Sequence, residues 1–445
     1  METAAFIKGN WREPAEVLAA FAEEAWTFAL LSDGKGEQGR WSYVARHPDA
    51  VLVVRPEDDA DAFAELAALL GQRQDNERGG PPMQGGVIGL AAYELGDRAE
   101  GIGLARYPGW PDLIAARYPA LLAFDHQNRE VVAVGRGENE LANLEYAHEA
   151  MGWLREAAWR ARRQGPLALA PTADDPALYE NAVRDVVARI SAGEIFQANI
   201  ARRWRGELVA GAKPSDLAVR LARDSAAPFA AYLRLEEQAV VCNSPERFLK
   251  TGPEGEIESR PIKGTARRGT DAAEDARLAQ ALARSAKDQA ENLMIVDLMR
   301  NDLSRVAAGG SVETSELYRV ETFANVHHLV STVTARLAEG KSAVDLLRAA
   351  LPAGSITGAP KVQAMKVIAA LEPPRGPFFG AMFWAGFNGA MDANVMIRTA
   401  LFEKKGDAWR FEARAGAGLI ADSDPAAERM ETEDKMAALL KALSG

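Results

Sequence analysis

Two extended stretches, Val240-Val-Cys-Asn-Ser-Pro-Glu-Arg-Phe248 and Ile257-Glu-Ser-Arg-Pro-Ile-Lys-Gly-Thr265, flank the turn sequence Gly252-Pro-Glu-Gly255. Apolar stretches joined by a short Gly/Pro turn are typical of a β-hairpin, whose strands run antiparallel. Elsewhere, strand-like and helix-like segments follow one another in mixed order, without strict strand–helix–strand alternation. The sequence therefore predicts an α+β fold and disfavours a doubly wound parallel sheet.

The hairpin also predicts that Glu246 and Lys263 are neighbours. With the turn centred between Pro253 and Glu254, Lys263 faces Ser244, and Glu246 is its diagonal neighbour about 7–8 Å away on the same face. A register shift of one residue would place the two side chains on opposite faces. A lysine with a lowered pKa is a nucleophile, and a nearby glutamate can move its proton. The alternative is a plain ion pair on a surface hairpin.

Composition narrows the class of protein. The chain has 445 residues, a net charge of −11 and 48% hydrophobic residues, which is ordinary for a globular protein of two or three domains. The acidic balance disfavours bulk nucleic-acid binding. The single cysteine, Cys242, excludes an internal disulfide and a cysteine-rich zinc site. No apolar run reaches the ~20 residues of a membrane span, and charges between Met1 and Pro14 exclude a secretory signal, so we expect a cytoplasmic protein.

A proline-containing stretch with weak periodicity, residues 164–176, predicts a linker between an N-terminal region, 1–163, and a C-terminal region, 177–445. Apolar runs predict strands and helical periodicity predicts helices in both regions. Examples are strands at Thr27–Leu31, Val87–Tyr93 and Val131–Val134, and helices at Glu140–Arg163, Tyr179–Ser191 and Ala272–Ala307.

Two predicted helices each carry a pair of carboxylates one turn apart. The pairs are Asp288 with Glu291, and Glu428 with Glu431. Ser285 caps the first helix, and Asp424 followed by proline starts the second. Carboxylates on two helices could hold a hard cation such as Mg²⁺. The alternatives are ordinary acidity at a helix start for the first pair and a surface ion pair between Glu431 and Lys435 for the second.

Other polar positions are less specific. With one cysteine and five histidines, a zinc site at His327–His328 is not expected. Either one of the two is a neutral donor or acid in a pocket, or they are hydrogen-bonded core histidines. The glycine-rich pieces Gly354–Lys361 and Gly416–Gly418 predict loops whose N–H groups could grip an anion, although neither matches a Walker or dinucleotide motif. Arg398, predicted inside a strand over Val395–Leu401, would need a carboxylate partner.

Six blocks in order, between about Pro176 and Leu440, resemble the chorismate-utilising enzymes, a family that includes anthranilate synthase component I, aminodeoxychorismate synthase component I and isochorismate synthases. The blocks are Ser244-Pro-Glu-Arg-Phe248, Arg260-Pro-Ile-Lys-Gly-Thr265, Glu291-Asn-Leu-Met-Ile-Val-Asp-Leu-Met-Arg-Asn-Asp302, Val326-His-His-Leu-Val-Ser331, Gly354-Ser-Ile-Thr-Gly-Ala-Pro-Lys361 and Gly416-Ala-Gly-Leu-Ile-Ala-Asp-Ser423. The resemblance implies a large α/β/β/α assembly of two packed antiparallel sheets flanked by helices, to which both sequence regions contribute.

One position sorts the chemistry within this family. Anthranilate synthases resemble Pro-Ile-Ala-Gly-Thr, whereas many aminodeoxychorismate synthases carry Pro-Ile-Lys-Gly-Thr, as this chain does with Lys263. The resemblance implies that Lys263 attacks C2 of chorismate with loss of the C4 hydroxyl, and that ammonia then adds at C4 and expels the lysine. The product is 4-amino-4-deoxychorismate, used for 4-aminobenzoate and folate. The alternatives are an anthranilate synthase with an incidental lysine and a catalytically silent chorismate-binding subunit.

The resemblance also assigns the other positions. Glu246 is the general acid/base, and His328 lies beside the ring and the departing hydroxyl. Glu291 and Glu431 coordinate Mg²⁺, with Asp288 and Glu428 helping. The positions that match binding sites for the anionic groups of the substrate are Gly264, Thr265, Arg398, Gly416, Ala417, Gly418 and Lys435.

Two partner proteins are also expected, and the sequence differs from the family's pattern at two places. Because Cys242 has no glutaminase context, ammonia is expected from a separate glutamine amidotransferase subunit, and the lyase that releases 4-aminobenzoate is expected as a separate protein. The chain has Phe383–Trp384 where the family often has Gly-Tyr. Leu30–Leu31–Ser32 is only a fragment of the Leu-Leu-Glu-Ser signature of tryptophan-inhibited members, so no tryptophan feedback is predicted.

Overall fold

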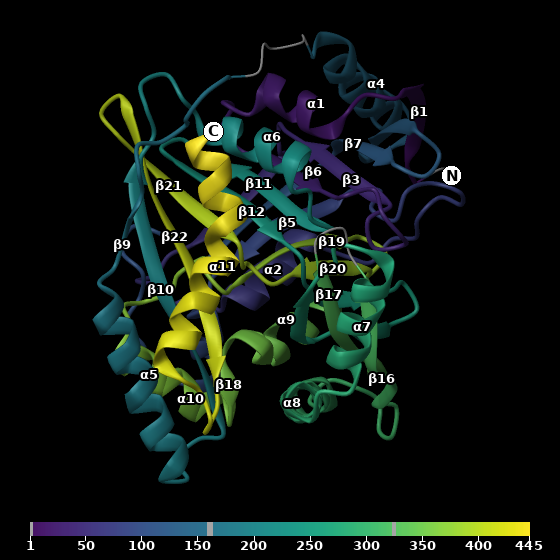
Figure 1. Cartoon of the computed structure of the whole chain (residues 1–445). Helices are drawn as coiled ribbons and strands as arrows, with labels where there is room; N and C mark the ends of the chain where they lie inside the picture. The colour runs from purple at the N-terminus through teal and green to yellow at the C-terminus, as the bar shows by residue number, and fades with distance from the viewer. Residues whose placement is uncertain (1–2, 158–162, 323–325) are drawn as a thin grey trace.

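Two large antiparallel sheets form the centre of the molecule (Figure 1). The structure, a computed structural model, describes residues 3–157, 163–322 and 326–445. Every strand pairing in these residues is antiparallel, which confirms the predicted α+β class and excludes a doubly wound sheet.

Sheet 1 has twelve strands and sheet 2 has ten. In spatial order, sheet 1 consists of β1 (Ala5–Asn10), β8 (Glu130–Gly135), β7 (Ala120–Asp125), β3 (Trp41–Ala45), β2 (Thr27–Leu31), β11 (Phe229–Arg234), β12 (Gln238–Ser244), β21 (Thr399–Lys405), β22 (Ala408–Leu419), β10 (Gln197–Glu207) and β18 (Gly358–Ala359), with β9 (Thr172–Ala173) beside β10. Sheet 2 consists of β15 (Ile262–Arg267), β17 (Val326–Arg336), β14 (Glu256–Ser259), β13 (Arg247–Thr251), β20 (Met391–Asn394), β19 (Ala381–Gly386), β5 (Gly86–Ala91), β6 (Leu113–Tyr118) and β4 (Ala50–Val54), with β16 (Glu313–Thr322) beside β17.

The helices surround these sheets. They are α1 (Pro14–Phe21), α2 (Ala62–Leu70), α3 (Leu95–Glu100), α4 (Glu140–Glu156), α5 (Pro176–Ser191), α6 (Pro214–Asp224), α7 (Ala272–Ala283), α8 (Ala286–Ser304), α9 (Ala343–Ala350), α10 (Lys361–Leu371) and α11 (Pro425–Ser444). No helix in the described ranges is long and apolar enough to cross a membrane. The predicted helix at Glu140–Arg163 is α4, and residues 158–162 of that prediction lie outside the described residues.

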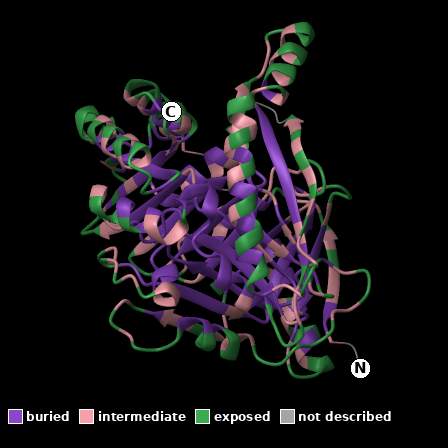
Figure 2. Cartoon of the chain, turned by 90° about the horizontal axis from the view of Figure 1, so that it is seen from below, coloured by how far each residue is buried: buried purple, intermediate pink, exposed green. Residues whose placement is uncertain are grey.

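Alternating side chains divide sheet 1 between two apolar clusters. Tyr43 and Leu233 belong to the cluster shared with sheet 2, while their neighbours Val44 and Tyr232 belong to the cluster shared with α1, α4, α6 and α11. This follows from the two-residue period of a strand, which sends successive side chains to opposite faces. Figure 2 shows the strands as the buried centre and the exposed residues gathered on the surrounding helices and connections.

Strands that precede residues 164–176 and strands that follow them belong to the same two sheets. In sheet 1, β2 pairs with β11, and Ala29 lies opposite Tyr232. In sheet 2, β5 pairs with β19, and Gly86 lies opposite Gly386. The N-terminal and C-terminal regions are thus joined by continuous hydrogen bonding in both sheets.

The predicted hairpin is wrong in its extent and its register. Within the predicted stretch, residues 240–265, the hairpin consists of β13 and β14 alone, and Thr251 pairs with Ile257, one residue out of the predicted register. The first arm, β12, belongs to sheet 1, and the last arm, β15, pairs with β17. Pro245 and Pro261 explain the difference, because a proline has no N–H with which to continue a ladder of hydrogen bonds.

Candidate functional site

The site begins where the chain passes from one sheet to the other at two adjacent places. Between β12 and β13 it passes through Glu246, and between β20 and β21 it passes through Arg398. The connections are bonded to each other, because Val395 N donates to Glu246 O at 3.1 Å and Asn243 N donates to Arg398 O at 3.1 Å. Arg398 is therefore outside the strand predicted for it, and it has a positive φ of 53°. The two crossings bring the carboxyl group of Glu246 and the guanidinium group of Arg398 together.

Glu246 is buried and hydrogen-bonded. Ser355 Oγ donates to Glu246 Oε1 at 2.8 Å. Burial raises the pKa of Glu246, although the bond from Ser355 and the positive charges of Lys263 and Arg398 oppose the rise. Burial also lowers the pKa of Arg398 to about 10. A carboxyl group with a raised pKa, beside cations, is suited to proton transfer.

Lys263, on β15, points its ammonium group toward β22. A Cβ atom added at Gly418 would lie 2.8 Å from Lys263 Nζ and 2.5 Å from Gln197 Nε2, so the ends of both side chains lie against this glycine and would have to move for a larger residue. Lys263 also acts electrostatically on Glu246, Glu291 and Glu431, whose pKa values its positive charge lowers. The structure therefore brings Lys263 and Glu246 together, as predicted, but through packing between sheets and without the predicted hairpin.

His328 lies on β17 opposite Thr265 of β15. Thr265 Oγ1 and His328 Nδ1 are 2.9 Å apart. The preceding His327 points elsewhere, with its ring hydrogen-bonded to Thr322 and Asp275. Of the two histidines, His328 is the one that faces the site, as shown by the effect of Arg398, whose positive charge lowers the pKa of this imidazole.

The buried His328 predicts a pH-dependent stability. Burial lowers the pKa of its imidazole to about 4, and the positive charge of Arg398 acts in the same direction. In the unfolded chain this pKa is about 6.5, so the unfolded state binds the proton first as the pH falls. The free energy of unfolding should therefore decrease from pH 6.5 to pH 4, by about 3 kcal/mol for this group.

Denaturant unfolding of wild type and His328→Gln at several pH values measures this contribution. The glutamine variant lacks the titration, so the stability advantage of wild type should shrink by that amount between pH 7 and pH 4. A difference that stays constant with pH would contradict a buried neutral imidazole.

The four predicted carboxylates lie near the starts of α8 and α11. Ser285 Oγ accepts from Asp288 N at 3.3 Å and Asp424 caps α11, which confirms both predicted helix starts. Burial raises the pKa of Glu291, and the charges of Asp288 and of Glu428 on the other helix add to the rise. The two helices thus direct carboxylates toward a common region.

These residues fit a divalent cation in chemistry, though they are engaged with lysines in this structure. Glu431 lies 2.5 Å from Lys435 Nζ, and Glu291 lies 3.9 Å from Lys287 Nζ. Within the described part of the chain, no three His, Cys, Asp or Glu side chains form a group that could hold a metal ion. Mg²⁺ commonly takes only one or two carboxylates and keeps several waters, so a pair of glutamates is a sufficient donor set. The negative charges of Glu291 and Glu428 repel each other, and a bound cation would reduce this repulsion.

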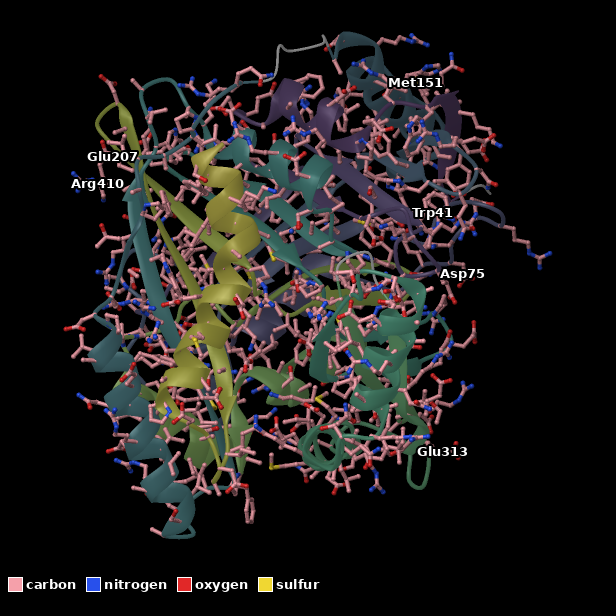
Figure 3. The ribbon with its side chains drawn as sticks, in the orientation of Figure 1. Trp41, Asp75, Met151, Glu207, Glu313 and Arg410 are labelled. Carbon is pink, nitrogen blue, oxygen red and sulfur yellow. The ribbon has the colours of Figure 1, made fainter. Side chains whose placement is uncertain are left out.

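Gly416, Ala417 and Gly418 lie inside β22, so the prediction of a loop is wrong. Figure 3 shows the far end of the β10–β22 pair, where the exposed ion pair of Glu207 and Arg410 spans 3.3 Å. At the site end, β21 pairs with β22 only as far as Arg414, which leaves the following backbone accessible to side chains. Lys435 Nζ uses this edge and donates to Gly416 O at 2.9 Å. Pairing with β10 makes residues 416–418 part of a strand, and on their other side no strand among the described residues covers the backbone.

Gly264 allows β15 to approach α8. Its φ is +87°, and a Cβ added there would lie 3.0 Å from Asp288 Cβ. A side chain at this position would be strained and would separate the strand that carries Lys263 from the helix that carries Glu291.

Two residues of the site were not predicted. Ser355 stands inside a quoted motif, but the pattern gave no partner for its hydroxyl. Gln197 is fully buried, and both of its polar atoms are without a hydrogen-bond partner among the described residues. The strand β10, Gln-Ala-Asn-Ile-Ala-Arg-Arg-Trp-Arg-Gly-Glu, carries several polar residues, so no signal in the sequence set Gln197 apart.

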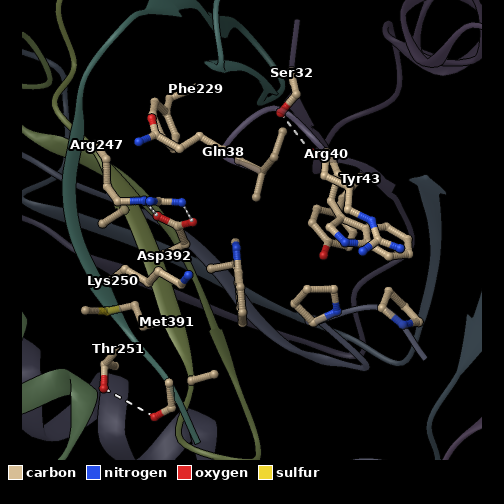
Figure 4. A pocket seen from close by; sticks show the side chains of 18 of the residues that line it. Ser32, Gln38, Arg40, Tyr43, Phe229, Arg247, Lys250, Thr251, Met391 and Asp392 are labelled. Carbon is tan, nitrogen blue, oxygen red and sulfur yellow. Dashed lines mark hydrogen bonds and ion pairs between the residues drawn. The ribbon is translucent and has the colours of Figure 1, made fainter. Parts of the chain in front are cut away.

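A separate cavity of about 560 Å³ lies on the other side of the crossing. Leu30, Leu31, Ser32 and Trp384 line it, and none of the predicted site residues does. Figure 4 shows its wall, where the Arg247 guanidinium binds Asp392 through two contacts of 2.9 Å. Glu246 and Arg247 are adjacent in sequence but face the site and the cavity respectively.

Comparison with known proteins agrees with these residues. Residues 27–441 match the family model described as chorismate binding enzyme. The chain is 38% identical to aminodeoxychorismate synthase component 1 of Klebsiella aerogenes over all of both chains, and 36% identical to anthranilate synthase component 1 of Thermus thermophilus over 97% of this chain and 95% of the other. Anthranilate synthase component I of Streptococcus pneumoniae has the same fold, with a TM-score of 0.78 and 27% identity over 91% of this chain and 93% of that one. The chain therefore belongs to the chorismate binding enzyme family, as its six sequence blocks predicted.

Proposed function

We propose that this chain aminates chorismate with ammonia and forms 4-amino-4-deoxychorismate. The observation that carries the proposal is the position of Lys263, whose ammonium group faces Glu246 and the glutamates of α8 and α11. The relative from Klebsiella aerogenes, which aligns over the whole chain, is named aminodeoxychorismate synthase component 1. A lysine at this position distinguishes the proposed chemistry from direct attack of ammonia at C2.

In the proposed reaction, the neutral amine of Lys263 forms a bond to C2 of chorismate, the two conjugated ring double bonds shift, and the C4 hydroxyl takes a proton and leaves as water. Ammonia then adds at C4, the two double bonds shift back, and the bond between C2 and the lysine nitrogen breaks, which returns the free amine. We assign Glu246 to the proton transfers, because its buried carboxyl has a raised pKa and faces both Lys263 and Arg398. We place the neutral His328 beside the ring and the departing hydroxyl.

The dianionic substrate needs cationic and N–H groups. We propose that Arg398, Lys435 and the N–H groups of Gly264 and Thr265 bind its carboxylates, together with the backbone of Gly416–Gly418. The open edge of β22 beyond Arg414 supports the last assignment. Desolvation, which lowers the pKa of both Arg398 and Lys435, strengthens the contacts of these two cations, because charges in a low-dielectric environment interact more strongly than in water.

We propose that Glu291 and Glu431 hold Mg²⁺, with Asp288 and Glu428 helping. When bound, the ion supplies positive charge that offsets these acidic side chains and attracts a carboxylate of chorismate. The repulsion between Glu291 and Glu428 supports this assignment.

We also propose that ammonia comes from a separate glutamine amidotransferase subunit and that a separate lyase releases 4-aminobenzoate. The name of the Klebsiella aerogenes relative, component 1, implies a second component for that enzyme. No residue set with a glutaminase function is apparent in the described chain, where the lone Cys242 is buried and its pKa is raised to about 11 by burial.

A direct assay tests the proposed function. The purified chain is supplied with chorismate, Mg²⁺ and either an ammonium salt at alkaline pH or glutamine. Ammonium should give a product that added lyase converts to 4-aminobenzoate, and glutamine should not until a cognate amidotransferase is added. Anthranilate fluorescence would instead indicate an anthranilate synthase, and the absence of turnover would indicate a silent chorismate-binding subunit. Glutamine-dependent turnover by the chain alone would contradict the proposed partner.

A further inference from the structure

A buried ion pair lies outside the residues used above. Lys361 Nζ is 2.6 Å from Asp302 Oδ2, and the two side chains are only 9% and 3% exposed. A buried pair is a poor source of stability, because the cost of removing both charges from water offsets their attraction. The pair is therefore better understood by the segments that it holds in place than by a contribution to stability.

The ammonium of Lys361 joins three helices. It donates to Asp302 near the end of α8 and, at 2.7 Å, to the carbonyl of Ala350, the last residue of α9. Lys361 itself is the first residue of α10. The connection between α9 and α10, residues 351–360, is thus closed at both of its ends by one charged group and fixed to α8.

This connection supports Glu246. It carries Ser355, which donates to the Glu246 carboxylate at 2.8 Å. Its Gly354 lies against α8, since a Cβ added there would be 2.5 Å from Leu298 Cδ2. The helix to which it is fixed also carries Asp288 and Glu291. One buried ion pair therefore fixes the position of Glu246, through Ser355, relative to α8, the helix that carries Asp288 and Glu291.

We propose that Lys361 and Asp302 are positioning residues that hold Ser355 against Glu246, and so set the Glu246 carboxyl relative to α8. The inference rests on the proposed function for the role of Glu246, but the placement of the connection is a separate claim. Lys361 does not touch the reacting atoms; it acts through Ser355.

Steady-state kinetics with chorismate and ammonium test the positioning role. Lys361→Met and the milder Asp302→Asn should lower kcat about 10- to 100-fold, because small displacements of a catalytic group have losses of this size. The KM for chorismate should stay within about twofold, because neither residue binds substrate. Asp112→Asn is the matched control: Asp112 is also a buried carboxylate, bound by Arg98 at 2.8 Å and Arg106 at 3.3 Å, away from the site. The control should lose thermal stability and keep its kcat.

A double-mutant cycle with Ser355→Ala decides whether the effect passes through Ser355. If it does, adding Lys361→Met to Ser355→Ala should cost less than about threefold more. Losses that multiply would overturn the inference, as would an unchanged kcat in Lys361→Met and Asp302→Asn.

Amide hydrogen exchange gives a readout that needs no turnover. Exchange in residues 351–360 should be faster in Lys361→Met and Asp302→Asn than in wild type and Asp112→Asn, because the closure of the connection is lost. Unchanged exchange would overturn the placement even if the chain proved inactive, whereas an inactive wild type with the expected exchange would overturn only the proposed function.

Discussion

Lys263→Ala should lower the formation of 4-amino-4-deoxychorismate by at least about a thousandfold, because it removes the proposed nucleophile. Lysine attacks as a neutral amine, yet its ordinary pKa is about 10.4. Glu246 is the available proton acceptor, because its buried carboxyl faces Lys263. By opening C2 to ammonia, the variant should also release some C2-aminated product.

Intact-mass measurement tests the covalent step directly. Wild type incubated with chorismate and no ammonia should gain the mass of chorismate less water, and peptide mapping after digestion should place this gain on the peptide that contains Lys263. Lys366→Ala, which removes an exposed lysine of α10, is the control and should retain both the adduct and the rate. An alanine variant at position 263 with the wild-type rate and product, together with no adduct in wild type, would refute the mechanism.

Glu291→Gln and Glu431→Gln should each lower Mg²⁺-dependent turnover at least about a hundredfold while the chain stays folded. Each substitution keeps the shape of the side chain and removes the negative charge that a hard cation requires. Thermal unfolding provides the second readout, because a ligand that binds only the folded state raises the midpoint. Mg²⁺ should raise the midpoint of wild type and have a smaller effect in either variant.

Glu433→Gln is the matched control for the metal, since Glu433 lies on α11 but is bound by Arg202 at 2.8 Å and Arg429 at 2.7 Å. It should keep both the turnover and the Mg²⁺-induced shift. Unchanged activity of Glu291→Gln and Glu431→Gln at limiting Mg²⁺ would remove these residues from the proposed metal site.

Local signals in the sequence predicted the helices near the site well. Ser285 and Asp424 cap α8 and α11, because the first N–H groups of a helix need acceptors and short polar side chains supply them. Strand predictions such as Thr27–Leu31 are also confirmed, as β2. In contrast, β6, with the sequence Leu-Ile-Ala-Ala-Arg-Tyr, was not predicted, because alanines have low strand propensity and the strand has no polar alternation.

Pairing between distant segments explains what sequence reasoning missed. The hairpin prediction assumed that β12 and β15 pair with each other, whereas β12 lies between β11, which precedes it, and the distant β21, and β15 pairs with the distant β17. For the same reason Gly416–Gly418 were predicted as a loop: their partner strand is β10. Gln197 gains meaning only when β10 places it beside Lys263. The six sequence blocks identified the family despite this, because they are recognised from the order of their residues and do not depend on knowing which strands pair.

The shared sheets have a consequence for how this protein is made. Gly86 finds its partner in Gly386, and Ala29 finds its partner in Tyr232, so neither sheet is complete when the N-terminal half leaves the ribosome. Until then β2 and β5 present unpaired strand edges, which are templates for association with other chains. Topologies dominated by such distant contacts fold slowly. The longer these edges wait for their partner strands, the greater the tendency of the incomplete chain to aggregate.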